Sequence, residues 1–296
     1  MSTDTQAVGQ ASGSRRTKDA LFKLGLFTCL GLTIAMLLVL LVDIAADGAG
    51  DLTWSFITSF SSINADQSGI QAALWGTIWL MGVCALFIVP VGVATAIYLE
   101  EYADNTRWFN RLIELNIQNL AAVPSIVYGI LGLAFLVRGP LSLGPVILAG
   151  GLTLGLLVLP VVIIAGREAI RAVPPSIREG SMALGATQWQ TIWKQVLPAA
   201  IPGIATGVIL ALARAIGETA PLIVVGAATF IAFNPTGLDS DFTAMPIQIF
   251  DWISRPSNDV NDYRPLAAAG ILLLMILLLA MNSVAIWLRN RYEQKW

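Results

Sequence analysis

The sequence contains no histidine, so the side chain most often used as a general base and as a zinc ligand is missing. Only two cysteines occur, Cys29 and Cys84, and both lie in apolar runs, which indicates buried free thiols. Charged residues are 12% of the 296 residues, about half of the share usual in a soluble domain. No metal-ligand cluster and no nucleophile constellation is recognisable. These absences predict no catalytic residue and no metal site, and they disfavour a membrane enzyme.

What the sequence has in abundance is apolar residues, which make up 56% of the chain. A bilayer core requires about 20 consecutive, mostly apolar helical residues. The sequence therefore predicts an all-α, polytopic membrane protein with six transmembrane helices. The six apolar runs cover residues 21–43, 70–99, 117–137, 143–166, 199–231 and 265–288.

Proline and glycine interrupt these runs and indicate how the helices pack. A helix in lipid tolerates proline only where neighbouring groups satisfy the freed carbonyls, so we expect kinked helices in a bundle. Glycine allows two helices to approach closely, and plain packing is the alternative interpretation of each such residue. The prolines are Pro90, Pro124, Pro160 and Pro221, and the clearest glycines are Gly150, Gly151 and Gly155.

Basic residues predict the orientation, because cytoplasmic loops carry an excess of lysine and arginine. With both termini inside, thirteen of the 17 basic residues fall in cytoplasmic segments and three fall in outer loops. We expect residues 1–20 to be a disordered cytoplasmic N-terminus, 21–290 to be one membrane domain and 291–296 to be a cytoplasmic C-terminus. The apolar core of the first run is longer than that of a signal peptide, which favours an uncleaved anchor.

The cytoplasmic loop 167–198, between the fourth and fifth runs, carries the clearest local signals. Pro174 and Pro175 interrupt the chain. Ser176 is then the predicted N-cap of a short helix over about 177–184, with Glu179 completing a capping box. Gly185 is expected to end that helix in a left-handed conformation. A second helix is predicted to follow and to run to Pro198.

Two charged residues, Arg214 and Glu218, fall near the middle of the fifth run. A charge at mid-bilayer costs roughly 2.5–3.5 kcal/mol, so both must face protein or water. Their i,i+4 spacing places them on one helix face. One interpretation is that Arg214 faces the transport pathway and contacts an oxyanion, since guanidinium matches phosphate oxygens. The other is a structural ion pair that determines helix packing.

Further polar residues near the spans have two interpretations each. Ser125 and Tyr128 follow Pro124, and their hydroxyls either line a pathway or form local hydrogen bonds. An acidic group ends the second run close to two arginines and predicts a solvated, salt-bridged rim, with gating or partner contact as the alternative. This group is Glu100, Glu101 and Asp104, and the arginines are Arg107 and Arg111.

The segment EGSMALGATQWQTIWKQVLP, residues 179–198, resembles the loop of membrane subunits of ABC importers. The family pattern is Glu-Ala-Ala, Gly and Ile-x-Leu-Pro; Gly180 and Ser181 replace the alanines here, and Gln195 replaces the isoleucine. The resemblance implies a helix that docks on an ATPase subunit. The residues implied in this docking are Glu179, Gly180, Ser181, Met182, Ala183, Leu184 and Gly185. The chain has no GxxxxGK[ST] loop, so ATP hydrolysis must come from a partner.

Three further segments narrow the resemblance to permease subunits of bacterial phosphate-specific ABC importers, and among these to the PstA type. They are AIYLEEYA (96–103), NLAAVPSIVYGILG (119–132) and ALARAIGETAPL (211–222), and the last implicates Arg214 and Glu218 in transport. The resemblance implies the type I permease fold of ABC importers, in the plasma membrane. It also implies alternating access with a homologous second permease, an external phosphate-binding protein, and two ATPase subunits that bind the ATP and magnesium. This chain itself would hold no cofactor.

Alternative substrates remain open on the residues alone. An intramembrane arginine disfavours a neutral substrate but does not distinguish phosphate from sulfate or molybdate. An ion-coupled secondary carrier is the other alternative, and it would leave the 179–198 motif unexplained.

Overall fold

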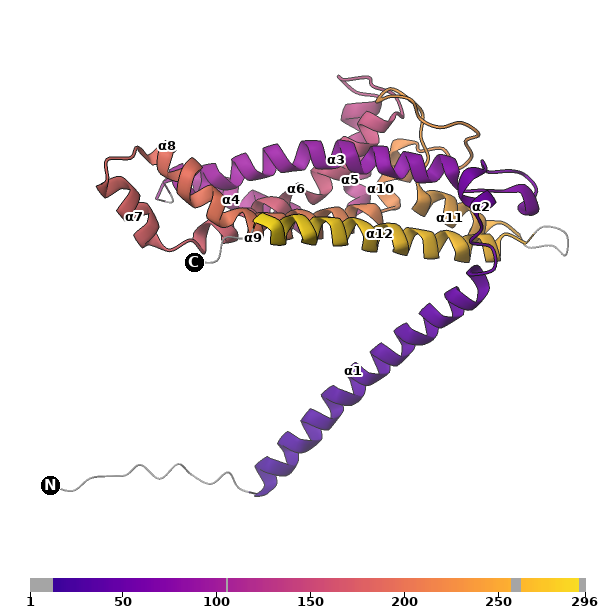
Figure 1. The fold of residues 1–296 in the computed structure, drawn as a ribbon, viewed down its shortest axis with the longest axis horizontal. Coiled ribbons are helices and arrows are strands. Elements are labelled where there is room, and N and C mark those ends of the chain that lie inside the picture. Colours follow the sequence, from indigo (N-terminus) through magenta and orange to yellow (C-terminus); the bar gives the residue numbers. More distant parts are fainter. Residues whose placement is uncertain (1–12, 105, 257–261, 293–296) are drawn as a thin grey trace.

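The computed structural model describes residues 13–104, 106–256 and 262–292, and the regular structure in these ranges is helical (Figure 1). The α-helices are α1 (Gly13–Gly48), α2 (Trp54–Thr58), α3 (Gln71–Ile97), α4 (Trp108–Ala121), α5 (Ser125–Leu131), α6 (Ile147–Arg171), α7 (Pro175–Ala183), α8 (Gln188–Thr191), α9 (Leu197–Ile216), α10 (Ala220–Val225), α11 (Met245–Ser254) and α12 (Arg264–Tyr292). A 3-10 turn covers Ala65–Gln67, and π-helical segments cover Tyr98–Tyr102, Gly132–Val137 and Ile192–Val196.

Five helical stretches of the described chain are long and apolar enough to cross a membrane. They are Lys18–Gly48, Gln71–Tyr102, Ile147–Arg171, Gln188–Ile216 and Arg264–Arg291. The third predicted span is instead a bent pair, because Trp108–Ala121 and Ser125–Val137 meet at an angle of 109°. The all-helical, polytopic prediction is confirmed, with a sixth span only if the bent pair is counted as one.

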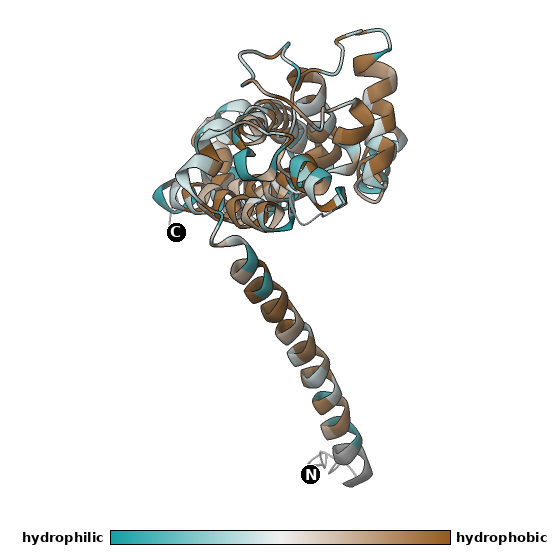
Figure 2. Ribbon diagram, turned by 90° about the vertical axis from the view of Figure 1, so that its right-hand side faces the viewer, coloured by the Kyte–Doolittle hydropathy of each residue, from teal (hydrophilic) through white to brown (hydrophobic). Residues whose placement is uncertain are grey.

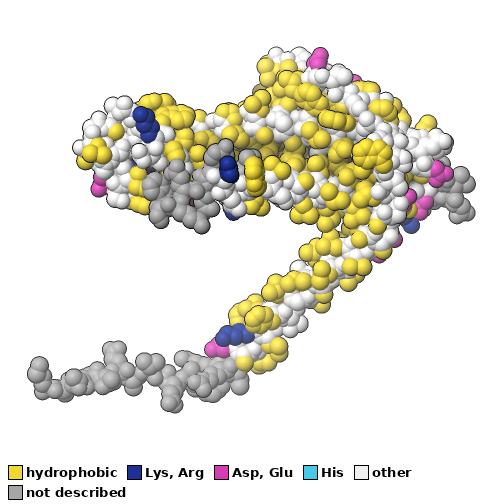
Figure 3. Space-filling model, viewed as in Figure 1, with side chains coloured by type: hydrophobic (Ala, Val, Ile, Leu, Met, Phe, Trp, Pro, Cys, Tyr) yellow, Lys and Arg dark blue, Asp and Glu magenta, His cyan; other side chains and the backbone are white. Residues whose placement is uncertain are grey.

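The long helices α3, α6, α9 and α12 lie side by side and form the body of the protein (Figure 1). We call the end that carries α7 and α8 the α7 end, and the end that carries α2 and α11 the α11 end. Most of α1 consists of hydrophobic residues (Figure 2), and many large hydrophobic side chains of α1 and of the body are exposed. On the face drawn in Figure 3, the charged side chains gather near the ends of the helices. This distribution is typical of a protein whose helix sides face lipid.

Glycine allows α3 and α6 to pack closely. A Cβ on Gly151 would lie 2.6 Å from Val83, and one on Gly155 would lie 2.6 Å from Phe87. Neither distance is compatible with an ordinary van der Waals contact. The prediction that these glycines permit close helix approach is confirmed.

Proline divides the spans only in part as predicted. The helices α3 and α6 continue through Pro90 and Pro160. Pro124 and Pro221, in contrast, stand at the start of the half-helices α5 and α10. Both real interruptions therefore occur in spans that split into two shorter helices.

The first helix starts earlier than expected. Residues 13–20 were predicted to belong to a disordered N-terminus, but α1 begins at Gly13; residues 1–12 lie outside the described part. Arg15, Arg16 and Lys18 are good helix formers, which allows the helix to extend beyond its apolar stretch. Among the long helices α1 packs against α12, with Gly48 directly against Ala268.

Candidate functional site

The break between α9 and α10 changes the predicted fifth span. Residues 199–231 were expected to form one helix, and this was wrong: α9 ends at Ile216, Gly217 caps it, and α10 starts at Ala220 and ends before Gly226. Pro221 has no backbone N–H to donate to the carbonyl of Gly217, and it stands in the first turn of α10, where proline is tolerated, which explains why a new helix starts there. Gly226 has a φ of 99°, a conformation that suits glycine.

Arg214 and Glu218 lie on the two sides of the α9 terminus. Arg214 is in the last turn of α9 and Glu218 follows the cap, so they do not occupy one continuous helix face as predicted. The Nε of Arg214 is 3.5 Å from Oε1 of Glu218, longer than the 2.7–2.9 Å of a strong charge-assisted hydrogen bond. The arginine side chain is 42% exposed and the glutamate 19%. A cation is favoured at a helix C-terminus. The guanidinium of Arg214, in the last turn of α9, has only this long contact with Glu218 among the contacts described.

The break between α4 and α5 contains the predicted pathway residues Ser125 and Tyr128. Ser125 is the first residue of α5 and is half-buried. Tyr128 is buried, and its hydroxyl donates a hydrogen bond of 2.8 Å to the carbonyl of Leu120 in α4. This bond joins the two half-helices across their bend. It agrees with the interpretation that the hydroxyl of Tyr128 forms a local hydrogen bond. That the two hydroxyls line a pathway stays a prediction.

The two breaks contact each other where α5 crosses α10. A Cβ on Gly129 would lie 2.7 Å from Cα of Pro221, so only glycine permits this crossing. The two interrupted helices thus cross at buried residues, and α10 begins two residues after Glu218. Interrupted helices at membrane depth occur where backbone is buried in protein or lines a cavity.

The helix α7 carries most of the residues predicted to dock on an ATPase subunit, and these residues are not buried. None of its nine residues, all of which are described, is buried. Glu179 and Gly180 are exposed, and Leu184 directly after the helix is 91% exposed. Gly185 has a φ of 87°, which confirms its predicted left-handed conformation. The whole set Glu179, Gly180, Ser181, Met182, Ala183, Leu184 and Gly185 lies together on this protruding turn.

The predicted cap of α7 was wrong. The helix begins at Pro175 after Pro174, with no side-chain cap, and Ser176 lies inside it. Proline is favoured at the first helical position because its missing N–H would have no partner there, so the helix starts before the serine. A capping box does occur at α8, where Thr187 and Gln190 bond reciprocally. The predicted second helix follows, but its predicted end at Pro198 was wrong: α8, a π-helical segment and α9 follow one another without a break to Ile216.

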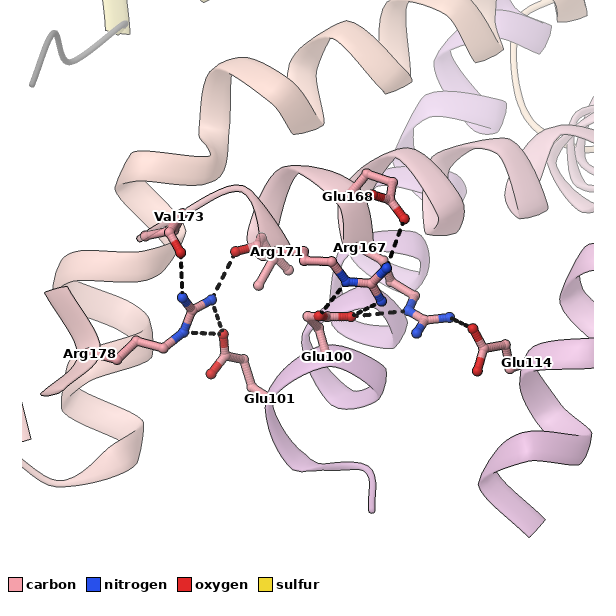
Figure 4. A network of polar contacts seen from close by, with 9 residues as sticks. Glu100, Glu101, Glu114, Arg167, Glu168, Arg171, Val173 and Arg178 are labelled. Atoms are coloured by element: carbon pink, nitrogen blue, oxygen red, sulfur yellow. Dashed lines mark hydrogen bonds and ion pairs between the residues drawn. The ribbon is translucent and has the colours of Figure 1, made fainter. Parts of the chain in front are cut away.

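A network of ion pairs joins α4, α6 and the π-helical end of α3 next to α7 (Figure 4). Glu100 accepts hydrogen bonds of 2.9 and 3.0 Å from the guanidinium of Arg171, and Arg167 lies 3.5 Å from the same carboxylate. Arg167 also donates a bond of 2.9 Å to Glu114 of α4. The side chain of Arg167 is 10% exposed, so its charge is largely compensated inside the protein.

The neighbouring Glu101 binds α7 itself. Arg178 donates two hydrogen bonds, of 2.7 and 3.0 Å, to one carboxylate oxygen of Glu101. These partners correct the predicted rim: Glu100 and Glu101 pair with arginines of α6 and α7, and in the described structure only Asp104 pairs with Arg107. The sequence did contain a signal for these pairs. Arg167 and Arg171, at an i,i+4 spacing, end the fourth predicted span on the same side of the membrane as the acidic end of the second span.

The geometry defines a class of protein: a polytopic membrane component with two interrupted spans and a protruding helical loop at one end. Within the described residues, no group of three or more His, Cys, Asp or Glu side chains is placed to hold a metal ion. Residues 88–295 match the family model described as "Binding-protein-dependent transport system inner membrane component". The chain therefore belongs to this family, whose members are non-catalytic membrane components of transporters.

Relatives extend the similarity over almost the whole chain. The "Probable ABC transporter permease protein YqgI" of Bacillus subtilis is 32% identical over 276 residues, which are 90% of this chain and 93% of the relative. The "Phosphate transport system permease protein PstA 1" of Mycobacterium tuberculosis is 35% identical over 280 residues, 93% of this chain and 90% of the relative.

A solved structure of a bacterial alginate ABC transporter in complex with its periplasmic protein shares the fold. Its TM-score is 0.69 at 16% identity, covering 95% of this chain and 98% of that chain. The predicted ABC importer permease fold is confirmed. Because the identity is low, this likeness concerns the fold alone.

Proposed function

We propose that this chain is the PstA-type permease of an importer for inorganic phosphate. The observation that carries the proposal is the loosely paired, 42% exposed Arg214 at an interrupted helix terminus within a transmembrane stretch. A guanidinium at membrane depth is costly in free energy unless it binds a partner. A phosphate ion can accept two parallel hydrogen bonds from the planar guanidinium through two of its oxygens. The names of several relatives, among them the mycobacterial protein, give a phosphate transport system.

In this proposal Glu218 holds Arg214 between transport events. A phosphate that reaches the α9–α10 break replaces the carboxylate on the guanidinium, and the 3.5 Å separation makes this exchange easy. When phosphate leaves, Glu218 returns to the arginine and neutralises it. Ser125 and Tyr128, on the neighbouring half-helix α5, are proposed to line the same route.

The energy for transport comes from partner subunits. The exposed turn from Glu179 to Gly185 docks on an ATPase subunit, which holds the ATP and magnesium. Leu184 is an apolar anchor for such an interface, because a nearly fully exposed leucine gains most from burial against a partner. ATP binding and hydrolysis displace α7 and alternate the access of the pathway between the two sides of the membrane.

The assembly that fits this role has a homologous second permease, two ATPase subunits and an extracytoplasmic phosphate-binding protein. The α7 end and both termini face the cytoplasm of a bacterium, and the chain lies in its plasma membrane. The excess of basic residues at the α7 end favours this orientation.

The experiment that tests the proposal is uptake by the full complex in proteoliposomes loaded with ATP. Arg214→Ala is expected to abolish phosphate uptake while the ATPase subunits still co-purify. Arg214→Lys, which keeps the charge but loses the planar fork, is expected to retain a small fraction of uptake. Normal phosphate uptake by Arg214→Ala would reject the role of this residue.

Sulfate and molybdate are the remaining candidate substrates, since both are oxyanions that a guanidinium binds. Each is added in excess during uptake of labelled phosphate. Uptake that persists supports phosphate as the substrate. If the wild-type complex transports sulfate or molybdate and not phosphate, the substrate assignment is wrong and the ABC permease role stays.

A further inference from the structure

Arg178 is the charged side chain of α7 that contacts the membrane body. It lies on the inner face of α7 together with Ile177 and Ser181, while Glu179 and Met182 point outward. Ile177 packs partly buried on the apolar cluster between α3, α6 and α9, and Ser181 bonds Thr191 of α8.

The guanidinium of Arg178 donates four hydrogen bonds. Besides its two bonds to Glu101, it donates bonds of 2.8 Å to the carbonyl of Ile170 and 2.6 Å to that of Val173. The side chains of Glu101 and Arg178 are 9% and 20% exposed, so this pair is largely shielded from water. A shielded pair with several hydrogen bonds resists separation far more than a surface pair.

Glu101 collects contacts from both sides of the loop turn. Its carboxylate binds Arg178, which precedes Gly185, and its backbone carbonyl accepts a bond of 2.7 Å from Gln188, which follows it. Glu101 belongs to the π-helical segment that continues α3 (Figure 4). These contacts attach the loop turn, on both sides of Gly185, to the end of α3.

The adjacent Glu100 extends the connection to α6 through Arg171 and Arg167. The two consecutive carboxylates thus attach α3 to α7 on one side and to α6 on the other. Because the two carboxylates belong to consecutive residues of one helical segment, a shift of the backbone there displaces both.

Near its opposite end α3 is attached to the start of α11 and to the residues just before it. The N–H of Met245 donates a bond of 2.9 Å to the hydroxyl of Thr77, and the backbone of Thr243 lies directly against Gly76. The 27 residues of α3 span about 40 Å at 1.5 Å per residue. A single helix therefore connects the loop turn with the far side of the membrane body.

We infer that the Glu101–Arg178 pair, supported by Glu100, transmits displacement of α7 to α3 and thereby couples ATPase movement to the transport pathway. This inference rests on the proposed function, in which α7 docks on an ATPase subunit. Glu101 and Arg178 act as positioning residues and do not contact the substrate. Docking uses the outer face of α7, whereas transmission uses its inner face, so the two roles are separable.

The test measures accessibility of the pathway without requiring any substrate. Gly217 at the end of α9 is exposed, and a Cβ there meets its nearest atom, the carbonyl oxygen of Arg214, at 3.9 Å, so Gly217→Cys is tolerated. It is introduced together with Cys29→Ala, because Cys29 is exposed, whereas Cys84 is buried and unreactive. Maleimide labelling of the full complex is compared without nucleotide and after trapping with ATP and vanadate.

The variants are Glu101→Gln, Arg178→Gln and the double variant, with Arg178→Lys as a second variant if the neutral ones do not fold. Asp104→Asn is the matched control, since Asp104 lies near the same end and its partner Arg107 is 77% exposed. We expect the nucleotide-dependent change in labelling rate to fall about tenfold in all three, within the range of typical coupling effects. The double variant should match the single ones, and the control should behave as wild type.

Two results would overturn the inference. One is a nucleotide-dependent change in labelling rate in the Glu101 and Arg178 variants that is as large as in the wild type. The other is loss of the ATPase subunits from these complexes, which would make the pair part of docking. A wild-type complex that fails to take up phosphate but keeps its labelling change would reject the proposed substrate and leave this inference intact.

Discussion

Gly129 offers a sharp test of the crossing between α5 and α10. In Gly129→Ala the new Cβ would lie 2.7 Å from Cα of Pro221 and 3.0 Å from its carbonyl oxygen. Carbon atoms in contact are ordinarily about 3.5–4.0 Å apart, so the two half-helices must separate by about 1 Å. Backbone atoms cannot rotate away, and overpacking of this kind costs about 1–3 kcal/mol.

The matched control is Gly82→Ala in α3, where the added Cβ meets no atom within 4 Å. Both substitutions gain about 1 kcal/mol of helix propensity, so their difference isolates the steric cost. At roughly 2–4 °C per kcal/mol, we expect Gly129→Ala to unfold about 2–12 °C below Gly82→Ala. The measurement is thermal unfolding of the purified complex in detergent. Equal unfolding midpoints would refute the described crossing.

The remaining predictions concern the second interrupted span and the loop turn. Tyr128→Phe removes the hydrogen bond to the carbonyl of Leu120, which keeps a longer bond of 3.2 Å from the N–H of Val123, so the free energy of unfolding should fall by about 0.5–1.5 kcal/mol; an unchanged midpoint would contradict the bond. Leu184→Asp should release the ATPase subunits from the complex in co-purification, whereas retained subunits would contradict the proposed anchor. Gly185→Ala is strained at a φ of 87° and should cost about 1–2 kcal/mol, raising amide hydrogen exchange in α7. Gly180→Ala, with no atom within 4 Å of the added Cβ, should not raise it.

Apolar composition alone determined that the chain crosses a membrane, and it located four of the five straight spans; for the remaining one, Gln188–Ile216, the predicted run 199–231 had the wrong bounds. This information is local, because about 20 consecutive apolar residues suffice for a helix in lipid. The left-handed turn at Gly185 was equally local, since it depends on one glycine after a short helix. The absence of a Walker A loop likewise required only the sequence.

The interruptions of the spans could be predicted only in part from the sequence. Pro90, Pro124, Pro160 and Pro221 give the same local signal, yet α3 and α6 continue through two of them. Whether a helix continues depends on neighbours that satisfy the carbonyls freed by proline, and those neighbours come from elsewhere in the chain. The 109° bend and the end of α9 at Ile216 were therefore decided by packing.

The partners of the charged residues were decided by tertiary structure alone. Glu100 and Arg171 are 71 positions apart, and Glu101 and Arg178 are 77 positions apart. The sequence showed that these charges end their helices near one side of the membrane. Only the close packing of α3 on α6 brings the carboxylates within reach of those arginines instead of Arg107 and Arg111, because an ion pair forms with whichever opposite charge the fold places beside it.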